Sequence, residues 1–195
     1  MRIITLLFAF SVASPALASG PFGFEPGTSL AVLSKQVKLE PVEEGVYSTT
    51  TAPKGHSAFE KYYLFVSPKA GLGKVVAIGF TINTSAYGNE LRSKFEQIEE
   101  GLVSKYGAGE KYDYLRAGSI WNDDNDWMMS LLKKERVLRH FWDAEQGSRV
   151  ADDTAGIILE ARAMSPGEGY VNLTYEFKCF EQWIAERKAK ENEAL

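Results

Sequence analysis

The sequence predicts an α+β protein in which an antiparallel sheet of about six strands is packed by three to four helices. Six short segments rich in Val, Tyr, Thr and Phe show the two-residue alternation of strands. Gly- and Pro-containing loops separate several of these segments, as in sheets whose consecutive strands run antiparallel. Longer segments with an apolar residue at every third or fourth position flank the strands, which is typical of amphipathic helices.

Residues 1–18 predict a secretory signal peptide that is cleaved after Ala18. Arg2 supplies the positive charge, residues 3–12 form an apolar run, and Ala16 and Ala18 are the small residues that a signal peptidase requires. The run is too short to span a bilayer, and no other stretch is long and apolar enough for a membrane helix. We therefore expect an exported protein, in the periplasm or outside the cell, with no membrane span after cleavage.

The rest of the chain has the length and composition of one globular domain, predicted over residues 28–195. The sequence has 22 Lys and Arg residues against 26 Asp and Glu residues, and the basic residues are scattered among acids. No nucleic acid partner is expected, since phosphate binding requires a basic face. Cys179 is the one cysteine of the sequence, so no internal disulfide can form. Its register with apolar strand positions indicates a buried side chain, and pairing with a thiol of another molecule is the alternative. The motifs typical of a metal site or a cofactor are missing, and we expect neither.

The first elements follow a Gly/Pro-rich leader over residues 19–27, which Phe22 and Phe24 are expected to hold against the domain. A short helix is predicted next, through about residue 36, with Thr28 or Ser29 as its N-cap. The following segments, rich in Val, Tyr, Thr and Phe, predict an antiparallel meander of three strands. These strands lie near residues 45–51, 59–66 and 74–82.

The third of these strands has two different faces. Val76, Ile78 and Phe80 point one way, whereas the smaller Val75 and Ala77 point the other. The face with the larger side chains is expected to lie in the core.

The next segment predicts an amphipathic helix of about 20 residues. It ends at Gly107, because glycine readily adopts the left-handed conformation of a helix C-terminal cap. The apolar positions recur at spacings of four, three, four and four residues: Leu91, Phe95, Ile98, Leu102 and Tyr106.

An irregular stretch is expected between this helix and the sequence WNDDNDW, which leads into a second helix with Trp127, Met128 and Leu131 on its apolar side. A final helix begins near Phe180 and ends in a charged tail. Three further strands are predicted near residues 136–142, 155–164 and 169–178.

The order helix, three strands, helix therefore occurs twice, over residues 28–106 and 124–192. This order suggests two αβββα halves and an internal duplication. The residues of the two halves do not align convincingly, so the strand order of the sheet is the test of the hypothesis.

Residues 121–127 contain the strongest candidate for a chemical site, because Trp121 lies near three carboxylates, those of Asp123, Asp124 and Asp126. Carboxylates carry out the proton transfers of glycoside hydrolysis, and aromatic rings stack on sugars. The same residues are also typical of a helix N-terminus, where Asp side chains accept backbone N–H groups. Both interpretations stay open, and so does the question of whether the protein is an enzyme.

No catalytic residue is assigned from the sequence. His56 lies in a Gly-containing loop and His140 lies in a strand, and a Ser/His/Asp triad would have to use one of these two histidines. A solvated loop residue and a packed strand residue are the simpler interpretations.

A candidate binding patch comes from strands that are apolar on both faces, near 59–66 and 136–142. A sheet with one buried face does not need both faces to be apolar. Either helices cover part of the second face, or aromatic side chains stay exposed as a contact patch. The candidate patch consists of Tyr63, Phe65, Arg139, His140 and Trp142.

Two local features resemble a group of small exported α+β proteins that includes BamE-like assembly lipoproteins and domains like the β-lactamase inhibitor protein. These features are a helix opening at residues 27–30, with Val32 behind it, and a helix that closes in the sequence Lys-Tyr-Gly at 105–107. The resemblance implies an α+β fold whose sheet or loops bind another protein. The chain departs from the lipoprotein pattern because it lacks the lipidated cysteine, so a membrane anchor is not implied.

Three classes of function follow from the sequence. The leading hypothesis is a non-catalytic binding module whose partner is another envelope or extracellular protein. The alternatives are a carbohydrate-binding protein or hydrolase that uses the Trp and Asp residues of 121–127, and a carrier of a small apolar ligand in a cavity under the sheet. The sequence predicts no oligomeric state.

Overall fold

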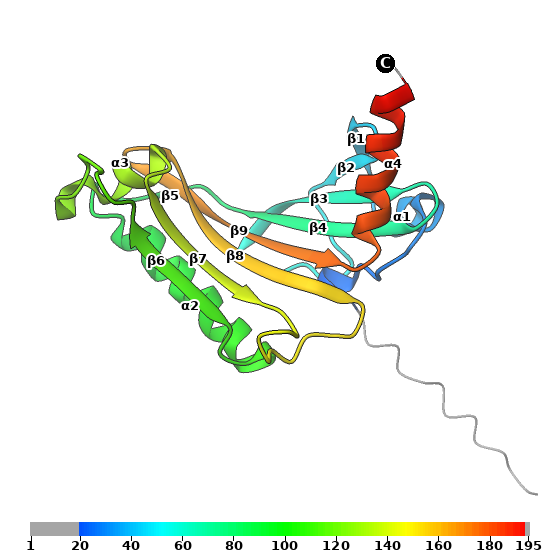
Figure 1. Ribbon diagram of the computed structural model, residues 1–195, viewed down its shortest axis with the longest axis horizontal. Helices are drawn as coiled ribbons and strands as arrows, with labels where there is room; N and C mark the ends of the chain where they lie inside the picture. The colour runs from blue at the N-terminus through cyan, green and yellow to red at the C-terminus, as the bar shows by residue number, and fades with distance from the viewer. Residues whose placement is uncertain (1–19, 194–195) are drawn as a thin grey trace, which may run out of the picture.

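The computed structural model describes residues 20–193, so the predicted signal peptide lies outside the described residues. The strands form one open antiparallel sheet in the order β1-β2-β3-β4-β9-β8-β7-β6, and β5 pairs with the start of β9 (Figure 1). The strands are β1 (Glu40–Glu43), β2 (Val46–Thr49), β3 (Phe59–Ser67), β4 (Gly71–Gly79), β5 (Ile82–Asn83), β6 (Glu110–Leu115), β7 (Arg136–Trp142), β8 (Thr154–Ser165) and β9 (Glu168–Phe177). The helices are α1 (Leu30–Gln36), α2 (Asn89–Tyr106), α3 (Trp127–Leu132) and α4 (Phe180–Glu193), with 3-10 turns η1 (Pro21–Gly23) and η2 (Asp124–Asp126).

The sheet consists of two antiparallel meanders. Strands β1 to β4 follow one another in space, strands β6 to β9 do the same, and the two meanders join where β4 pairs with β9. Each meander is preceded by one helix, α1 or α2, and α3 lies between β6 and β7 in the chain. The α+β class and the antiparallel sheet are therefore as predicted. The αβββα halves over 28–106 and 124–192 do not match the structure, because α2 opens the second meander instead of closing the first.

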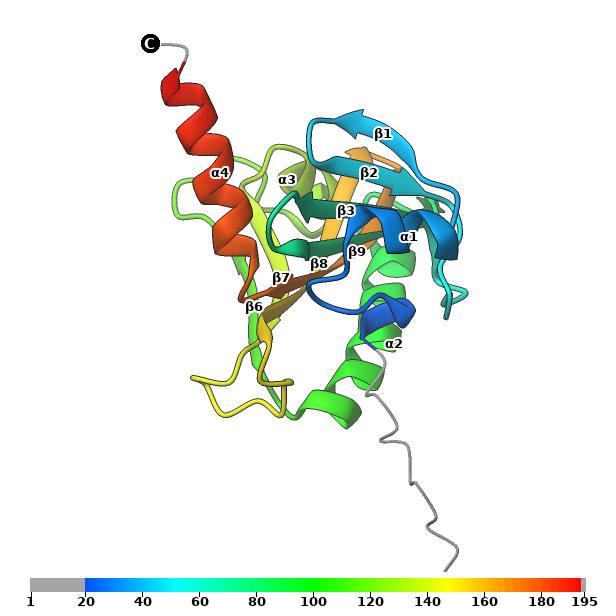
Figure 2. The ribbon, with the colours of Figure 1, turned by 90° about the vertical axis from the view of Figure 1, so that its right-hand side faces the viewer.

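The main core lies between the sheet and the helices α1, α2 and α3. Leu33 of α1, Phe95 of α2 and Met128 of α3 are fully buried in one cluster with strand residues such as Leu159 and Leu173. Helix α4 packs against β3 and β4. Figures 1 and 2 show α4 at one end of the sheet, with its C-terminal half reaching beyond the strands.

Helix α4 lies on the opposite face of the sheet from the other helices. Its Phe180 and Trp183 rings pack on Phe65, with ring centroids 5.8 and 5.4 Å away, and Phe65 alternates along β3 with the core residue Leu64. Beyond the contacts of α4 with β3 and β4, the rest of this face runs from Tyr63 of β3 across β4, β9, β8 and β7 to β6, and none of the described helices packs on it. We call it the uncovered face.

The strand predicted near 74–82 has the opposite orientation from the prediction: its smaller side chains face the core and its larger ones face away from it. Val76 and Ile78 are half-buried on the uncovered face, whereas Ala77 is fully buried under the helices. Ala77 lies between Tyr62 and Leu173 on the neighbouring strands. These larger neighbours fill the core beside Ala77, so the small side chain fits inward and the larger ones point outward.

The sheet has more strands than predicted because β1, β5 and β6 were not expected. Strand β5 has two residues and β1 has four exposed residues, so neither shows a pattern of burial. Strand β6 replaces part of the irregular stretch expected after Gly107, and its residues are exposed up to Leu115. Both β1 and β6 are edge strands, which have little apolar content to mark them.

The leader packs against the domain through its two aromatic residues. Phe24 is fully buried, and the Phe22 ring meets the rings of Phe59, Tyr62 and Tyr175 edge-on, with centroid distances of 5.0 to 5.9 Å. Phe22 has a φ of 56°, an unusual backbone conformation for a bulky residue. The Phe22 carbonyl accepts a hydrogen bond from the backbone N–H of Lys54 at 2.9 Å, which ties the leader to the loop between β2 and β3.

Two further features of the described residues concern the predicted environment of the chain. None of the helices within residues 20–193 is long and apolar enough to cross a membrane. Cys179 is half-buried beside the core, and its thiol donates to the carbonyl oxygen of Leu72 at a sulfur–oxygen distance of 3.3 Å.

Candidate functional site

The uncovered face carries a row of mainly apolar side chains that crosses five strands. The strand registers place one residue of each strand directly beside the next, from β3 through β4, β9 and β8 to β7. The row consists of Tyr63, Val76, Thr174, Ile158 and Phe141. Thr174 in the middle of the row is buried, and the other four residues are half-buried.

A charged cluster lies beside this row. Glu160 of β8 is 92% buried and accepts hydrogen bonds from two arginines, Arg139 of β7 and Arg162 of the same strand. The Nε atoms of Arg139 and Arg162 lie 3.1 and 2.8 Å from the Glu160 carboxylate oxygens. The carboxylate thus fixes both guanidinium groups on the face, where they retain N–H groups for a partner.

Aromatic side chains extend the face to the edge of the sheet. Tyr112 and Tyr114 of β6 are 36% and 47% exposed, and they alternate with Lys111 and Asp113 along the strand. The Tyr112 ring meets the Phe141 ring edge-on at 5.7 Å. Hydrogen bonding to Glu110 raises the pKa of the Tyr112 hydroxyl, with burial as a smaller cause, so this hydroxyl stays protonated at neutral pH.

The structure divides the five residues of the predicted patch between the two faces. Tyr63 and Arg139 lie on the uncovered face, half-buried. Phe65 lies on the same face but under α4. His140 and Trp142 are buried on the opposite face, under α2, with their rings stacked 4.0 Å apart, so they are not part of an exposed patch. The alternation along β7 separates them, because residues 139 and 141 point outward and 140 and 142 inward.

The alternative site at 121–127 does not form a cleft with its carboxylates. Asp123 and Asp124 are exposed, and they line neither the cleft beside α2 described below nor the pocket beside α4. Asp123 and Asp126 precede η2 and α3 but make no side-chain capping bond, so the predicted N-cap is also not observed. Trp121 is half-buried. Trp127 is 95% buried, between the guanidinium groups of Arg92 and Arg136.

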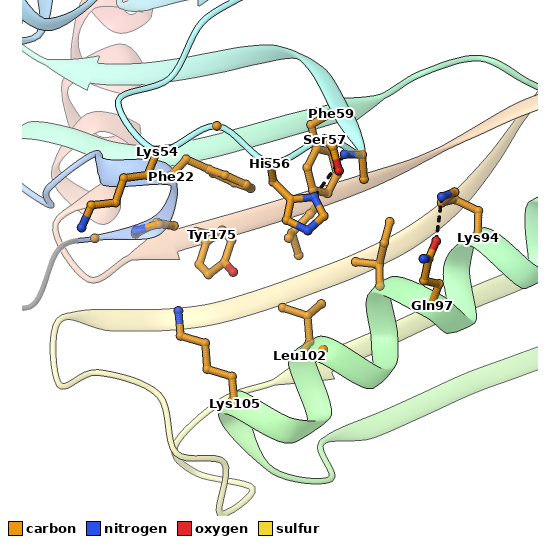
Figure 3. Close-up of a pocket in the computed structure, with 17 residues that line it drawn as sticks. Phe22, Lys54, His56, Ser57, Phe59, Lys94, Gln97, Leu102, Lys105 and Tyr175 are labelled. Carbon is orange, nitrogen blue, oxygen red and sulfur yellow. Dashed lines mark hydrogen bonds between the residues drawn. The ribbon is translucent and has the colours of Figure 1, made fainter.

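A cleft of about 710 Å³ lies on the helix-covered side of the sheet (Figure 3). One wall is the leader with the loop between β2 and β3, and the other is one side of α2. Residues of β9 form the floor between them. The α2 residues that line it follow helical spacing, at positions 94, 97, 98, 101, 102 and 105.

Three lysines line this cleft. Lys54 comes from the loop, and Lys94 and Lys105 come from α2. Figure 3 shows Lys54 and Lys105 on opposite walls at the end where Tyr175 lies, and Lys94 towards the other end. The Lys94 ammonium donates to the Gln97 side chain at 2.7 Å, and none of the three forms an ion pair within residues 20–193.

His56 also lines the cleft, on the loop wall. Its Nδ1 accepts the backbone N–H of Ala58 at 3.1 Å. In the neutral ring the proton is therefore on Nε2, which makes this nitrogen a donor.

Sequence reasoning did not identify Tyr112, Tyr114 or Arg162 on the uncovered face, nor the cleft. The alternation of Lys111, Tyr112, Asp113 and Tyr114 was the available signal for β6. The sequence indicates the cleft less clearly, because its walls come from three separate segments. The one local sign is Gly101, a glycine inside a strongly periodic helix, in the segment that forms the α2 wall.

No family model, curated protein or solved structure matches this chain.

Proposed function

We propose that this chain is an exported, non-catalytic protein-binding module whose uncovered face contacts another envelope or extracellular protein. The observation that carries the proposal is a sheet face on which apolar, tyrosine and arginine side chains lie together over five strands, and on which the one described helix, α4, covers only part of β3 and β4. Tyrosine and arginine are enriched among the residues that contribute most to protein–protein binding. A large uncovered apolar face on a protein of this size is typical of an interaction surface.

The arrangement of the face favours a protein partner over a small ligand. The row from Tyr63 to Phe141 crosses five strands, and its residues line neither the cleft beside α2 nor the pocket beside α4. Small-molecule sites are concave, whereas protein interfaces are broad and have an apolar centre with polar groups around it. The Arg139, Glu160 and Arg162 cluster supplies polar groups that are held in place before binding.

The predicted export and the resemblance to small binding domains of the cell envelope support the same proposal. A signal peptide would bring the chain to a compartment where its partner is an envelope or extracellular protein. The resemblance implies binding through the sheet or its loops, and the uncovered face belongs to the sheet.

The test is capture of a partner from an envelope extract with the chain from Ser19 onward, followed by affinity measurements on that partner. The Tyr63→Ala and Tyr114→Ala variants should each weaken binding by about tenfold or more, because both rings lie on the uncovered face. Tyr87→Ala is the matched control, since Tyr87 is about as exposed as Tyr114, at 50% and 47%, but lies in the loop before α2. Trp142→Ala is unsuitable because this residue is fully buried in the core.

Circular dichroism of each variant must show an unchanged fold. A partner whose affinity is the same for Tyr63→Ala, Tyr114→Ala and the parent would rule out the uncovered face. An extract that yields no partner for the folded chain would count against a protein-binding function altogether.

A further inference from the structure

We propose that the cleft between α2 and the leader binds a small amphipathic anion, with an apolar tail and a carboxylate or phosphate head group. This site lies on the other side of the sheet from the uncovered face, so the proposal does not depend on the proposed protein partner. Its volume of about 710 Å³ is within the range of pockets that enclose drug-sized ligands.

The floor of the cleft suits an apolar tail. Tyr175 is 94% buried, and burial is the main cause that raises the pKa of its hydroxyl, so the ring stays neutral. Leu102 and Leu173 are also buried next to it. The apolar residues that line the cleft are Phe22, Phe59, Ile98, Leu102, Leu173 and Tyr175.

The charge of the cleft suits an anionic head. Lys54, Lys94 and Lys105 line it, and no Asp or Glu does. This excess is opposite in sign to the whole chain, which has a formal net charge of −4. Lysines without carboxylate partners next to a low-dielectric floor attract an anion more strongly than lysines spread over an open surface.

Gly101 lines the cleft on the α2 side without a side chain. A Cβ atom at this position would meet no other atom within 4 Å, so the space above the helix is empty. Glycine in a helix interior costs about 1 kcal/mol relative to alanine. Helix α2 is otherwise strongly amphipathic. Its one interior glycine, which lowers helix stability, is at the position where a side chain would enter the cleft.

The opposite wall is fixed in place. The hydrogen bond from Lys54 to the Phe22 carbonyl and the contacts of the Phe22 ring hold the leader against the loop. The His56 ring lies on the same wall, with Nε2 as a donor. A wall that is ordered before binding reduces the entropy lost when a ligand binds.

The experiment is a calorimetric titration of the chain from Ser19 onward with decanoate, below the concentration at which decanoate forms micelles. Decyl phosphate tests the second head group, decanol tests the tail without charge, and inorganic phosphate tests the charge without a tail. We expect at least one of the two amphipathic anions to bind, and decanol and inorganic phosphate to bind at least about tenfold more weakly.

Two variants locate the binding. Removing both charges at one end, with Lys54→Gln and Lys105→Gln together, should weaken binding of the anion about tenfold. Lys133→Gln removes an exposed charge at the end of α3 and should leave the affinity unchanged. Gly101→Leu should weaken binding at least tenfold while the protein stays folded, since a leucine side chain at this position enters the open space of the cleft.

Three outcomes would overturn the proposal. They are no binding of either anion, binding of decanol as tight as that of the tighter-binding anion, and anion binding that Gly101→Leu leaves unchanged. A thermal unfolding curve of Gly101→Leu that matches or exceeds the parent excludes misfolding as the reason for lost binding. None of these outcomes alters the test of the uncovered face, which uses a protein partner.

Discussion

His140 and Glu99 form a buried polar link between β7 and α2. The two ring nitrogens of His140 lie 2.6 Å from the Glu99 carboxylate and 2.6 Å from the Ala108 carbonyl oxygen. The second carboxylate oxygen of Glu99 accepts from the Lys111 ammonium at 2.7 Å. One carboxylate therefore joins the helix to two strands. Both ring nitrogens of His140 already have partners inside the fold.

The Glu99→Gln variant should lower the free energy of unfolding by about 1–3 kcal/mol, because it removes the charge that two buried or half-buried donors face. Urea denaturation monitored by circular dichroism measures this change. Glu100→Gln is the matched control, since Glu100 is the next residue, is exposed and forms no ion pair within residues 20–193. Equal unfolding midpoints for the two variants would show that the link adds no stability.

Glu90 makes the free energy of unfolding depend on pH in the acid range. The Thr84 hydroxyl donates to its carboxylate at 2.6 Å and is the main cause that lowers its pKa, followed by the backbone N–H groups of Glu90 and Ser85. Because folding lowers this pKa, the stability that Glu90 adds is complete above the unfolded value of about 4.3. It is lost as the pH falls through the lower, folded value.

Glu90→Gln should therefore be less stable than the parent at neutral pH, and the difference should shrink as the pH falls below about 4. Denaturation curves at a series of pH values measure it. A difference that stays constant down to pH 2 would mean that ionisation of Glu90 makes no contribution.

At the scale of single elements, α4 is attached to the sheet at one end. Phe180 and Trp183 stack 5.1 Å apart on Phe65, and the Trp183 indole N–H donates to the Gly45 carbonyl at 3.3 Å. A Cβ atom at Gly73 would lie 2.8 Å from the Phe180 backbone, so the glycine is what lets the helix come this close. Beyond this contact the helix is held by two exposed ion pairs, Arg187 with Glu43 and Lys190 with Glu44, and by the Ser67 hydroxyl, which donates to the Glu186 carboxylate at 2.8 Å.

Trp183→Ala should release α4 while the sheet and α2 keep their structure, because the remaining exposed ion pairs and the single Ser67–Glu186 hydrogen bond add little stability. Hydrogen exchange followed by mass spectrometry should show faster exchange in 180–193 and unchanged rates in β8 and β9. The conservative Trp183→Phe variant should retain most of the protection. Faster exchange over the whole chain would contradict this local attachment.

Elements were predictable from sequence where burial is one-sided. Helix α2 begins and ends close to its predicted limits because Leu91, Phe95 and Tyr106 lie on one buried side and charged residues lie on the others. Strand β6 was not predictable in the same way. Strand β6 is an edge strand with both faces exposed. Its sequence alternates tyrosine with charged residues and is polar enough to be taken for a loop.

At the scale of the whole molecule, the sequence indicates that the sheet carries more apolar side chains than one core requires. It does not indicate which face of each strand the helices cover. Val76 and Ile78 look like core residues by size, but Tyr62 and Leu173 fill the inner layer beside Ala77. The choice depends on contacts between strands distant in the chain, which a local pattern does not contain.

The cleft could not be predicted from the sequence for the same reason. Its lining combines residues 20–22 and 54–59 with one side of α2 and with β9. The sequence predicted the leader, the loop and the helix separately, and their meeting depends on the joining of β4 to β9. The uncovered face is closer to prediction, since two of its residues, Tyr63 and Arg139, were candidates for a binding patch.

The two edges of the sheet determine how the molecule behaves when it is crowded. Strand β1 has four residues, includes Pro41, which lacks an N–H, and changes register between Pro41 and Glu43. Strand β6 carries Glu110, Lys111 and Asp113. Both edges resist the addition of a further strand, and this is how natural sheets avoid growing into fibrils. The chain can thus display a wide β-surface at high concentration without becoming a template for aggregation, and a partner has to dock on the face.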